Sequence, residues 1–467
     1  MKLNKQIVAT ILILCFSFTL FAQQPTRDFS KETARTSPDW VKDAVIYEIF
    51  PRQYSNKGDF NWITTDLDRL NTLGVTVLWL MPIHPIGKLK SKGTIGSPYA
   101  VKDYYAINPD YGTKADLQKL ISEAHKRGLK VIIDIVANHT SWDSVMMKNP
   151  AFYTHNDKGE IIPPVPDWAD VADLNYDNPE TRKYMTEMLV SWIRDYDLDG
   201  FRCDVAFFVP TDFWDNARKE IDKIKPETIW IAEAETPDLL LKAFNLDYSW
   251  AIHSALTNVI QGNAPASEIR KTWERQKAEM PKNSLLMRFS DNHDERRAIA
   301  RFGEKGALAA QTLAFTLDGV PMLYNGMETG DTTESGSPAL FEKLPIFWQF
   351  AERRPEFPRF YKEMIDLRKN SIALRRGDLT WLKNSDEGRV LTFLRRSGDE
   401  EVLVAINMTN ASFAGFVETN GSFVEITPDI AHPLPPDDDK MKEKTNANIG
   451  LPALTLDAFG FRIFRKK

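Results

Sequence analysis

The chain has 467 residues, which is more than one ordinary hydrophobic core supports. This length suits a large barrel with one or two smaller additional domains. Hydrophobic residues make up 43% of it and charged residues 27%, a composition that excludes wholesale disorder. The net charge of −6 gives no basic footprint for nucleic acid, so we expect no nucleic-acid partner.

Residues 1–22 have the pattern of a secretory signal peptide. Two lysines precede an apolar run over residues 7–20, and the small residue Ala22 stands just before a polar stretch. The run is short for a membrane-spanning helix. We therefore expect a cleaved signal, a short N-terminal extension over residues 23–43, a secreted or periplasmic protein, and no membrane association after cleavage. Only Cys203 would then remain, so the mature monomer would hold no internal disulfide.

From residue 43 onward, short apolar or β-branched runs alternate with segments whose apolar residues recur every three or four positions. This alternation predicts βα units around a parallel sheet. The expected strands are Val45–Phe50, Thr76–Met81, Lys130–Val136, Gly200–Asp204, Thr228–Ala232, Leu246–Trp250, Leu285–Phe289 and Pro321–Tyr324. Eight units predict an α/β fold, a (β/α)8 TIM barrel over residues 44–137 and 176–376. The sixth strand has the weakest pattern, because residues 245–249 are polar at alternate positions.

Two regions break the alternation. Residues 138–175 hold four prolines and little periodicity, which predicts a small inserted domain after the third strand with little regular structure. Beyond residue 376, runs separated by Gly, Asn and Asp turns predict a separate antiparallel β domain over residues 377–467. The expected strands there are Val390–Leu394, Val402–Asn407, Phe423–Ile426 and Phe459–Phe464.

Polar side chains gather directly after the ends of the predicted barrel strands, where barrel enzymes keep their active sites. Asp204 ends the fourth strand, Glu233 follows the fifth and Asp294 follows the seventh. A single carboxylate at a strand end is more often a helix cap than a catalyst. Three acids on three strands of one barrel indicate an active site instead. The side chains that accompany them are those of His139, Arg202 and His293.

The runs around these acids resemble the conserved regions of the α-amylase family of glycoside hydrolases. The resemblance extends from about residue 45 to the C-terminus. Seven ordered blocks carry it: residues 79–82, 103–113, 134–139, 200–204, 229–233, 289–294 and 319–328. It implies a (β/α)8 barrel, a small domain after the third strand and a C-terminal β-sandwich, which matches the organisation expected from the patterns.

The resemblance also implies roles for the acids. Asp204 matches the nucleophile and Glu233 the general acid/base of retaining hydrolysis, whose carboxyl groups should lie about 5–5.5 Å apart. Asp294 matches the third carboxylate, which favours the distorted, oxocarbenium-like state. Arg202 stands two residues before Asp204, so both side chains point to one face and the arginine charge would hold Asp204 ionised. Glu235 competes for the acid/base role, but Glu233 ends the apolar run directly.

Further positions match substrate and metal ligands of the family. His139 and His293 match its hydroxyl-binding histidines, and Tyr99 matches the aromatic platform under the sugar. Asn138 and Asp173 match calcium ligands, and oxygen ligands suit that hard ion. The resemblance therefore implies a calcium cofactor.

Two stretches depart from the family pattern. Residues 205–208 end in Phe207-Phe208, where many α-amylases have Lys-His that contacts the leaving sugar and helps to hold calcium. Phenylalanine side chains can do neither. The motif at residues 171–175 is intermediate between the version found in amylases and the version found in oligosaccharide-cleaving relatives. The sequence therefore leaves the preferred substrate length open.

The leading hypothesis is a retaining hydrolase that cleaves α-1,4-glucosidic bonds, with starch, glycogen or maltooligosaccharides as its α-glucan substrate. An α-glucan transglycosylase and an oligosaccharide-specific α-glucosidase are alternatives on the same scaffold, because they share the covalent intermediate. A non-catalytic glucan-binding protein is the distant alternative. Such relatives typically lose one or more of the three acids, whereas this chain keeps all three.

Overall fold

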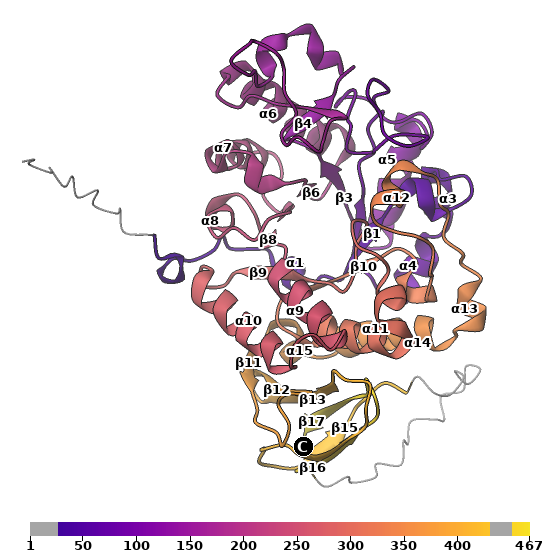
Figure 1. The fold of residues 1–467 in the computed structure, drawn as a ribbon, viewed down its shortest axis with the longest axis vertical. Helices are drawn as coiled ribbons and strands as arrows, with labels where there is room; N and C mark the ends of the chain where they lie inside the picture. The colour runs from indigo at the N-terminus through magenta and orange to yellow at the C-terminus, as the bar shows by residue number, and fades with distance from the viewer. Residues whose placement is uncertain (1–26, 430–450) are drawn as a thin grey trace, which may run out of the picture.

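Eight parallel strands close into a barrel in the computed structural model, which describes residues 27–429 and 451–467 (Figure 1). The expected signal peptide at residues 1–22 lies outside the described residues. The barrel order is β1-β10-β9-β8-β7-β6-β3-β2. The strands are β1 (Ile46–Ile49), β2 (Val77–Leu80), β3 (Lys130–Ile135), β6 (Gly200–Cys203), β7 (Ile229–Ala232), β8 (Leu246–Asp247), β9 (Leu285–Arg288) and β10 (Val320–Tyr324). The predicted (β/α)8 barrel is confirmed.

The barrel strands are buried on both faces, which is why their sequences run apolar without alternation. Alternate residues form two separate cores. One set points outward to the helices, and the other fills the barrel interior. The interior set includes Ile46, Val77, Trp79, Ile132, Ile229, Ile231, Leu246, Met287, Val320 and Met322. The barrel interior is therefore filled with side chains rather than open.

The prediction of a strand over Leu246–Trp250 is wrong in its second half. Strand β8 has only two residues, and helix α9 begins at Trp250. The buried carboxylate of Asp247 accepts hydrogen bonds from the backbone N–H groups of Thr236 (2.7 Å) and Tyr248 (2.8 Å). These bonds turn the chain out of the sheet directly after Asp247.

Helices surround the barrel, and α5 shows how the sequence sets their bounds. It begins after Thr113, whose hydroxyl and the carboxylate of Asp116 form a capping box. The α-helices are α1 (Asp39–Lys42), α2 (Pro51–Tyr54), α3 (Phe60–Thr65), α4 (Leu67–Leu73), α5 (Lys114–Lys126), α6 (Pro179–Tyr196), α7 (Thr211–Asp222), α8 (Leu239–Lys242), α9 (Trp250–Ile260), α10 (Ser267–Glu279), α11 (Ala298–Thr316), α12 (Ser337–Phe341), α13 (Phe350–Arg353), α14 (Glu356–Lys369) and α15 (Ile372–Arg376). Short 3-10 turns are η1 (Phe29–Lys31), η2 (Val145–Lys148), η3 (Pro150–Phe152), η4 (Ala206–Phe208) and η5 (Met327–Thr329). Within the described ranges, none of the helices has the length and apolarity needed to cross a membrane.

The excursion between β3 and α6 covers residues 138–175. Its two ends form β4 (His139–Ser141) and β5 (Val171–Asp173), which pair antiparallel. The prediction of little regular structure holds for the proline-rich residues 163–166 and is wrong at these ends. The pairing sets His139 opposite Asp173 and so returns the chain to the barrel mouth.

The C-terminal region is a β-sandwich, as predicted. A five-stranded sheet has the order β11-β12-β13-β17-β15 and faces a two-stranded sheet, β14-β16. The strands are β11 (Asp378–Trp381), β12 (Val390–Ser397), β13 (Glu400–Asn407), β14 (Phe413–Phe416), β15 (Phe423–Glu425), β16 (Ala453–Leu456) and β17 (Phe461–Lys466). Phe413, Leu454 and Leu456 of the small sheet share a core with Leu403 and Phe464 of the large one.

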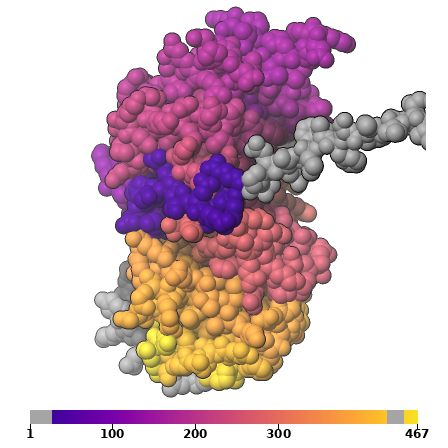
Figure 2. All heavy atoms as spheres, turned by 90° about the vertical axis from the view of Figure 1, so that its left-hand side faces the viewer, coloured from indigo at the N-terminus to yellow at the C-terminus, as the bar shows by residue number. Residues whose placement is uncertain are grey.

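The sandwich is not separate from the barrel in its packing. The other face of the large sheet, including Phe393, Val404 and Ile406, belongs to the same core as the barrel helices. Figure 1 shows this sheet directly below α11 and α15. In Figure 2 the N-terminal described residues, in indigo, lie across the side of the molecule between its magenta and orange parts. The barrel helices and the sandwich thus share one continuous hydrophobic core.

Candidate active site

The ends of several barrel strands and the excursion meet at one cavity of about 310 Å³. It receives all three predicted catalytic acids, both predicted histidines and Tyr99. Its lining is Lys92, Ser97, Tyr99, His139, Trp168, Asp170, Val171, Asp204, Val205, Glu233, His293, Asp294, Leu340 and Phe341. Acids from the ends of β6, β7 and β9 therefore face a single space.

Arg202 lies beneath the cavity and is fully buried. Its Nη1 donates to both carboxylate oxygens of Asp134 (3.0 Å each) and to Oδ1 of Asp204 (3.0 Å). Its Nη2 is 2.9 Å from Oε2 of Glu233 but makes no aligned hydrogen bond. One guanidinium thus faces three carboxylates, so the site holds more negative charge than its arginine can balance.

This excess of negative charge affects the pKa values of Asp204 and Glu233, the two acids that line the cavity beside Arg202. Burial, partly opposed by Arg202, raises the pKa of Asp204 to about 7, and neighbouring carboxylates add to the rise. Burial raises the pKa of Glu233 to about 7 as well, again against Arg202 and with the help of Asp204. The charge on Asp204 therefore disfavours ionisation of Glu233. Arg202 opposes the rise at both residues, through its hydrogen bond to Asp204 and its 2.9 Å contact with Glu233.

A strained turn holds Glu233 in place. Val205 has a left-handed backbone, with φ 36° and ψ 49°, a conformation that β-branched residues rarely adopt. In this conformation its N–H donates to Oε2 of Glu233 (2.8 Å), and the next N–H, of Ala206, donates to the Glu233 carbonyl (3.1 Å). The turn after one acid therefore positions the other.

The two histidines carry different charges. Burial alone would disfavour the imidazolium of His293, but Asp294 and Glu48 raise its pKa to about 9. Burial lowers the pKa of His139 to about 4, so that ring is neutral at neutral pH. His293 contacts Asp294 through Nε2 (3.2 Å), and Tyr99 stacks on it with ring centroids 5.4 Å apart. A cationic and a neutral donor therefore face the same cavity.

Sequence reasoning missed Glu48, which supports His293 from inside the barrel. This residue of β1 is fully buried and makes a short hydrogen bond with Nδ1 of His293. Burial raises the pKa of Glu48, although His293 opposes the rise. The sequence did hold one signal for a role of Glu48, because a charged residue in the middle of an apolar strand is unusual. The contacts of Trp168 and Lys92 at the cavity gave no such signal, because they depend on how the excursion folds.

Glu235, the competing acid, points elsewhere. Its carboxylate accepts hydrogen bonds from the Gln276 side chain (2.5 Å) and from the backbone N–H of Ala251 (2.8 Å), and it does not line the cavity. These contacts give it a structural role between β7 and the neighbouring helices. Of the two glutamates, Glu233 lines the cavity and Glu235 does not.

The expected calcium ligands lie beside the cavity rather than in it. Asn138 precedes β4, its side chain contacts Nδ1 of His139 (3.2 Å), and Asp173 ends β5. Burial raises the pKa of Asp173. Among residues 27–429 and 451–467, no three His, Cys, Asp or Glu side chains cluster as a metal site. Two side-chain oxygens fall short of the six to eight that calcium takes, so backbone carbonyls and water would have to supply the rest.

Known proteins match this chain over most of its length. The family described as the catalytic domain of alpha amylase matches residues 27–159 and 166–353, and a glycosyl hydrolase-like family matches residues 97–228. Alpha-amylase MalA of Haloarcula japonica is 28% identical over 79% of this chain, which spans only 56% of that protein. A cyclomaltodextrinase of Geobacillus thermopakistaniensis is 28% identical over 80% of this chain and 70% of its own length. The structure of an alpha-amylase from Lactobacillus plantarum has a TM-score of 0.79 at 31% identity, covering 92% of this chain and 100% of that one.

Proposed function

This chain belongs to the α-amylase family of glycoside hydrolases, and we propose that it cleaves α-1,4-glucosidic bonds of starch, glycogen or maltooligosaccharides with retention of anomeric configuration. One observation carries the proposal. Three acids that follow three barrel strands line one cavity, and a buried arginine contacts both Asp204 (3.0 Å) and Glu233 (2.9 Å). Retaining hydrolysis needs two carboxyl groups beside one glycosidic bond, because one must attack as a carboxylate while the other must hold a proton.

In the proposed first step, an oxygen of Asp204 attacks the anomeric carbon and Glu233 gives its proton to the departing glycosidic oxygen. The product is a glycosyl ester of Asp204 and a leaving sugar with a free hydroxyl. Glu233 is then ionised and takes a proton from water, whose oxygen attacks the same carbon and releases Asp204. The pKa of Glu233 near neutrality suits a group that both donates and accepts a proton.

The remaining side chains would hold the sugar at the cleavage point. We assign Asp294, His293 and His139 to sugar hydroxyls, because all three line the cavity and together offer both acceptors and donors. Tyr99 offers an aromatic surface to the apolar face of the sugar. Charged and hydrogen-bonding groups fixed in advance stabilise the positive charge that develops at the anomeric carbon.

A second candidate is cleavage of short or cyclic oligosaccharides in preference to starch. Trp168 and Asp170 of the excursion line the cavity, and Asp170 pairs with Lys92 from the segment after β2 (2.9 Å), from which we infer less space for a long chain. A relative named cyclomaltodextrinase is as similar to this chain as the α-amylase of Haloarcula.

Export of the enzyme is proposed on residues 1–22 alone.

Product analysis tests the proposal. Purified protein is incubated with starch, maltotriose, pullulan and cyclodextrins, and products are resolved over time, with the anomer formed first identified by proton NMR. The proposal predicts maltooligosaccharide products released as the α-anomer. Release of the β-anomer would exclude the double displacement, and turnover of cyclodextrins well above starch would favour the second candidate.

A further inference from the structure

A second large cavity lies at the opposite end of the barrel from the active site. Its volume is about 690 Å³, and a cavity of about 390 Å³ shares Lys277 and Asp318 with it. Its lining includes Leu285, the first residue of β9, and Gly319, which precedes β10. The active-site acids instead follow the barrel strands. The two cavities therefore open at opposite ends of the same strands.

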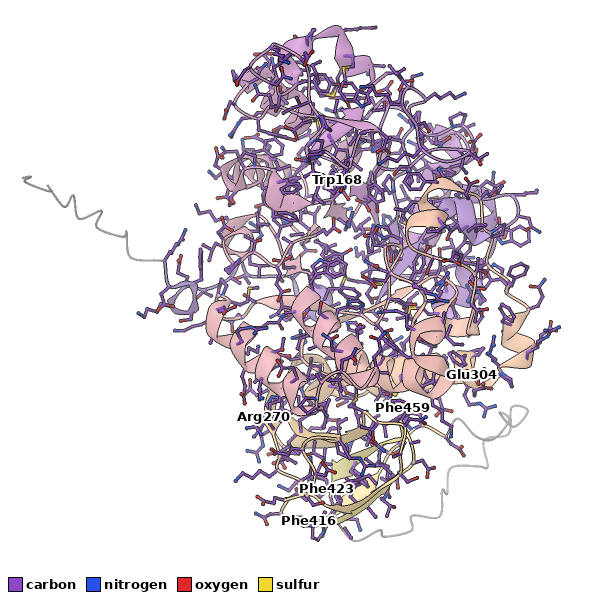
Figure 3. The ribbon with its side chains drawn as sticks, in the orientation of Figure 1. Trp168, Arg270, Glu304, Phe416, Phe423 and Phe459 are labelled. Atoms are coloured by element: carbon purple, nitrogen blue, oxygen red, sulfur yellow. The ribbon has the colours of Figure 1, made fainter. Side chains whose placement is uncertain are left out.

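Three parts of the chain that are distant in sequence surround this cavity. They are the N-terminal extension, the region from α10 to the start of β10, and the beginning of the sandwich. In Figure 2 the indigo N-terminal residues lie between the pink barrel helices and the orange residues that lead into the sandwich. Helix α10 also reaches the sandwich, since Arg270 pairs with Glu387 (3.5 Å) and lies directly above the sandwich in Figure 3. A ligand bound here would contact all three parts at once.

Positive charge dominates the lining of the cavity. Six cationic side chains line it, against the two carboxylates of Asp318 and Asp378. The cations are Arg35, Lys42, Lys277, Arg375, Arg376 and Arg395. The chain as a whole has a net charge of −6, so this local excess of cations runs against its overall balance. Clefts lined by one sign of charge concentrate ligands of the opposite sign.

Nearby carboxylates balance only part of this charge, because they are shared between cations. Asp43, outside the cavity, pairs with Arg375 (2.9 Å) and Arg376 (2.7 Å), and Asp318 pairs with Lys277 (2.7 Å) and Arg288 (3.1 Å). One carboxylate thus serves two cations in each case. The lining keeps an excess of positive charge that an anionic ligand would balance.

Arg395 adds a positive charge that no carboxylate contacts. It belongs to β12, is 1% exposed, and donates only to the backbone carbonyls of Thr316 (2.6 Å) and Gly377 (2.9 Å). Its Nε is buried without a hydrogen-bond partner, and no Asp or Glu of residues 27–429 and 451–467 forms an ion pair with it. Burial lowers the pKa of Arg395 to about 10, although Asp318 opposes the fall, so the group is cationic at neutral pH. An anion in the cavity would stabilise this buried charge.

We propose that this cavity binds a small molecule that bears a phosphate group. A phosphate group carries up to two negative charges, and its oxygens accept several charge-assisted hydrogen bonds at once. Lys42, Arg375 and Arg376 are part-exposed and supply the donors, while Arg395 acts through its charge from within the wall. The cavity volume lies within the range of small-molecule sites, about 300–1,000 Å³, and leaves room for an organic part beside the phosphate.

Calorimetric titration with inorganic phosphate tests the proposal, at an ionic strength held constant with sodium chloride. The double variant Lys42→Gln/Arg376→Gln removes two donors and leaves Asp43 paired with Arg375. We expect its affinity for phosphate to fall about tenfold. Lys42→Gln alone should show about a threefold loss and disturbs no buried contact, since Lys42 is 38% exposed. Absence of saturable binding by the wild type, or equal affinity of the double variant, would overturn the proposal.

Two control variants separate this cavity from general attraction of anions to lysine. Lys126→Gln/Lys223→Gln removes two cations whose side chains are 69% and 67% exposed and line neither of the two cavities. It should bind phosphate like the wild type. Lys42→Arg keeps the charge and should also retain binding. An equal loss of affinity in the control and in Lys42→Gln/Arg376→Gln would mean non-specific attraction and would refute the site.

A competition experiment tests for the organic part of the ligand. Glucose 6-phosphate should displace inorganic phosphate, whereas glucose should not, because recognition depends on the phosphate group. Failure of glucose 6-phosphate to compete would rule out a phosphate-bearing molecule.

Hydrolysis of maltotriose should stay within about twofold of the wild type in the double variant, because the reaction takes place at the other end of the barrel. Loss of both binding and hydrolysis in that variant would indicate general disruption and would count against the site. If the wild type binds phosphate but hydrolyses no glucan, the function proposed above fails and the phosphate site stands.

Discussion

The two ends of strand β6 carry aspartates with similar burial and opposite behaviour. Asp199 precedes the strand and is 1% exposed, and Asp204 follows it and is 7% exposed. Although burial opposes ionisation at both, the pKa of Asp199 falls to about 2 while the pKa of Asp204 rises to about 7. Burial alone therefore does not decide the charge state of either residue.

The number of hydrogen-bond donors and positive charges around each aspartate accounts for the difference between the two pKa values. Asp199 accepts hydrogen bonds from His125 (2.7 Å), Lys130 (3.2 Å) and Lys225 (3.2 Å), and from the backbone N–H of Val131 (2.8 Å). Asp204 has Arg202 alone, and that arginine also faces Asp134 and Glu233. The carboxylate at the N-terminal end of the strand is neutralised and contributes stability. The C-terminal end keeps unbalanced carboxylates, as the proposed nucleophile and acid/base require.

The largest expected effect is that of Asp204→Asn. An amide of the same shape cannot form the glycosyl ester, so kcat should fall more than a hundredfold, about 2.7 kcal/mol on the barrier. The melting temperature should not fall, because the change relieves repulsion among buried carboxylates. Steady-state kinetics and thermal unfolding measure both. Retention of more than about a tenth of wild-type kcat would contradict the nucleophile assignment.

Glu233→Gln removes proton donation and should act selectively. Turnover of maltotriose should fall strongly, whereas formation of the glycosyl ester from an activated aryl glycoside should be spared, because that leaving group departs without a proton. Glu235→Gln is the matched control and should affect stability more than leaving-group dependence. If Glu235→Gln shows the larger, leaving-group-dependent loss, the acid/base has been assigned to the wrong glutamate.

Asp199→Asn should affect stability and spare catalysis. The folded-state pKa of Asp199 lies below its ordinary value of 3.8, so its ionised form contributes stability above pH 4, and that contribution disappears as pH falls toward 2. The difference is worth about 2 kcal/mol at neutral pH. Urea unfolding of wild type and variant at several pH values measures it. A stability gap that does not shrink between pH 4 and pH 2 would argue against this charge account.

Calcium should give the smallest effect. If Asn138 and Asp173 are ligands, an ion that binds only the folded state raises the melting temperature as its concentration increases. We expect a rise of a few degrees between excess chelator and millimolar calcium, smaller than in a standard α-amylase. Elemental analysis of the purified protein accompanies the melts. A melting temperature indifferent to both conditions, with no calcium retained, would remove the metal from the site.

The sequence predicted the barrel well because buried parallel strands leave continuous apolar runs. The expected strand Lys130–Val136 and the observed β3 at Lys130–Ile135 differ by one residue. Prediction from the sequence failed where local hydrogen bonds overrode the apolar pattern, as at Asp247. It also missed strand β11, whose four residues are alternately exposed and half-buried. A short, half-buried edge strand carries too little apolar signal to be recognised.

The acids at the cavity were found because each follows a recognisable strand. Glu48 was missed because its partner, His293, lies 245 residues away in sequence and meets it only across the closed barrel. The pairing of Trp168 with Phe208 was likewise hidden, since one ring belongs to the irregular excursion and the other to η4. Contacts between distant segments depend on the folded path of the chain, which local patterns do not encode.

Trapping the covalent intermediate tests the central claim most directly. Glu233→Gln lacks the base that activates water, so the glycosyl ester should accumulate when this variant is given α-maltosyl fluoride. After acid quenching and peptic digestion, mass spectrometry should locate one maltosyl group on Asp204, in a peptide that contains residues 200–205. A maltosyl group on Asp294 or any other residue, or rapid fluoride release with no adduct at any time, would contradict the assignment of Asp204 as the nucleophile.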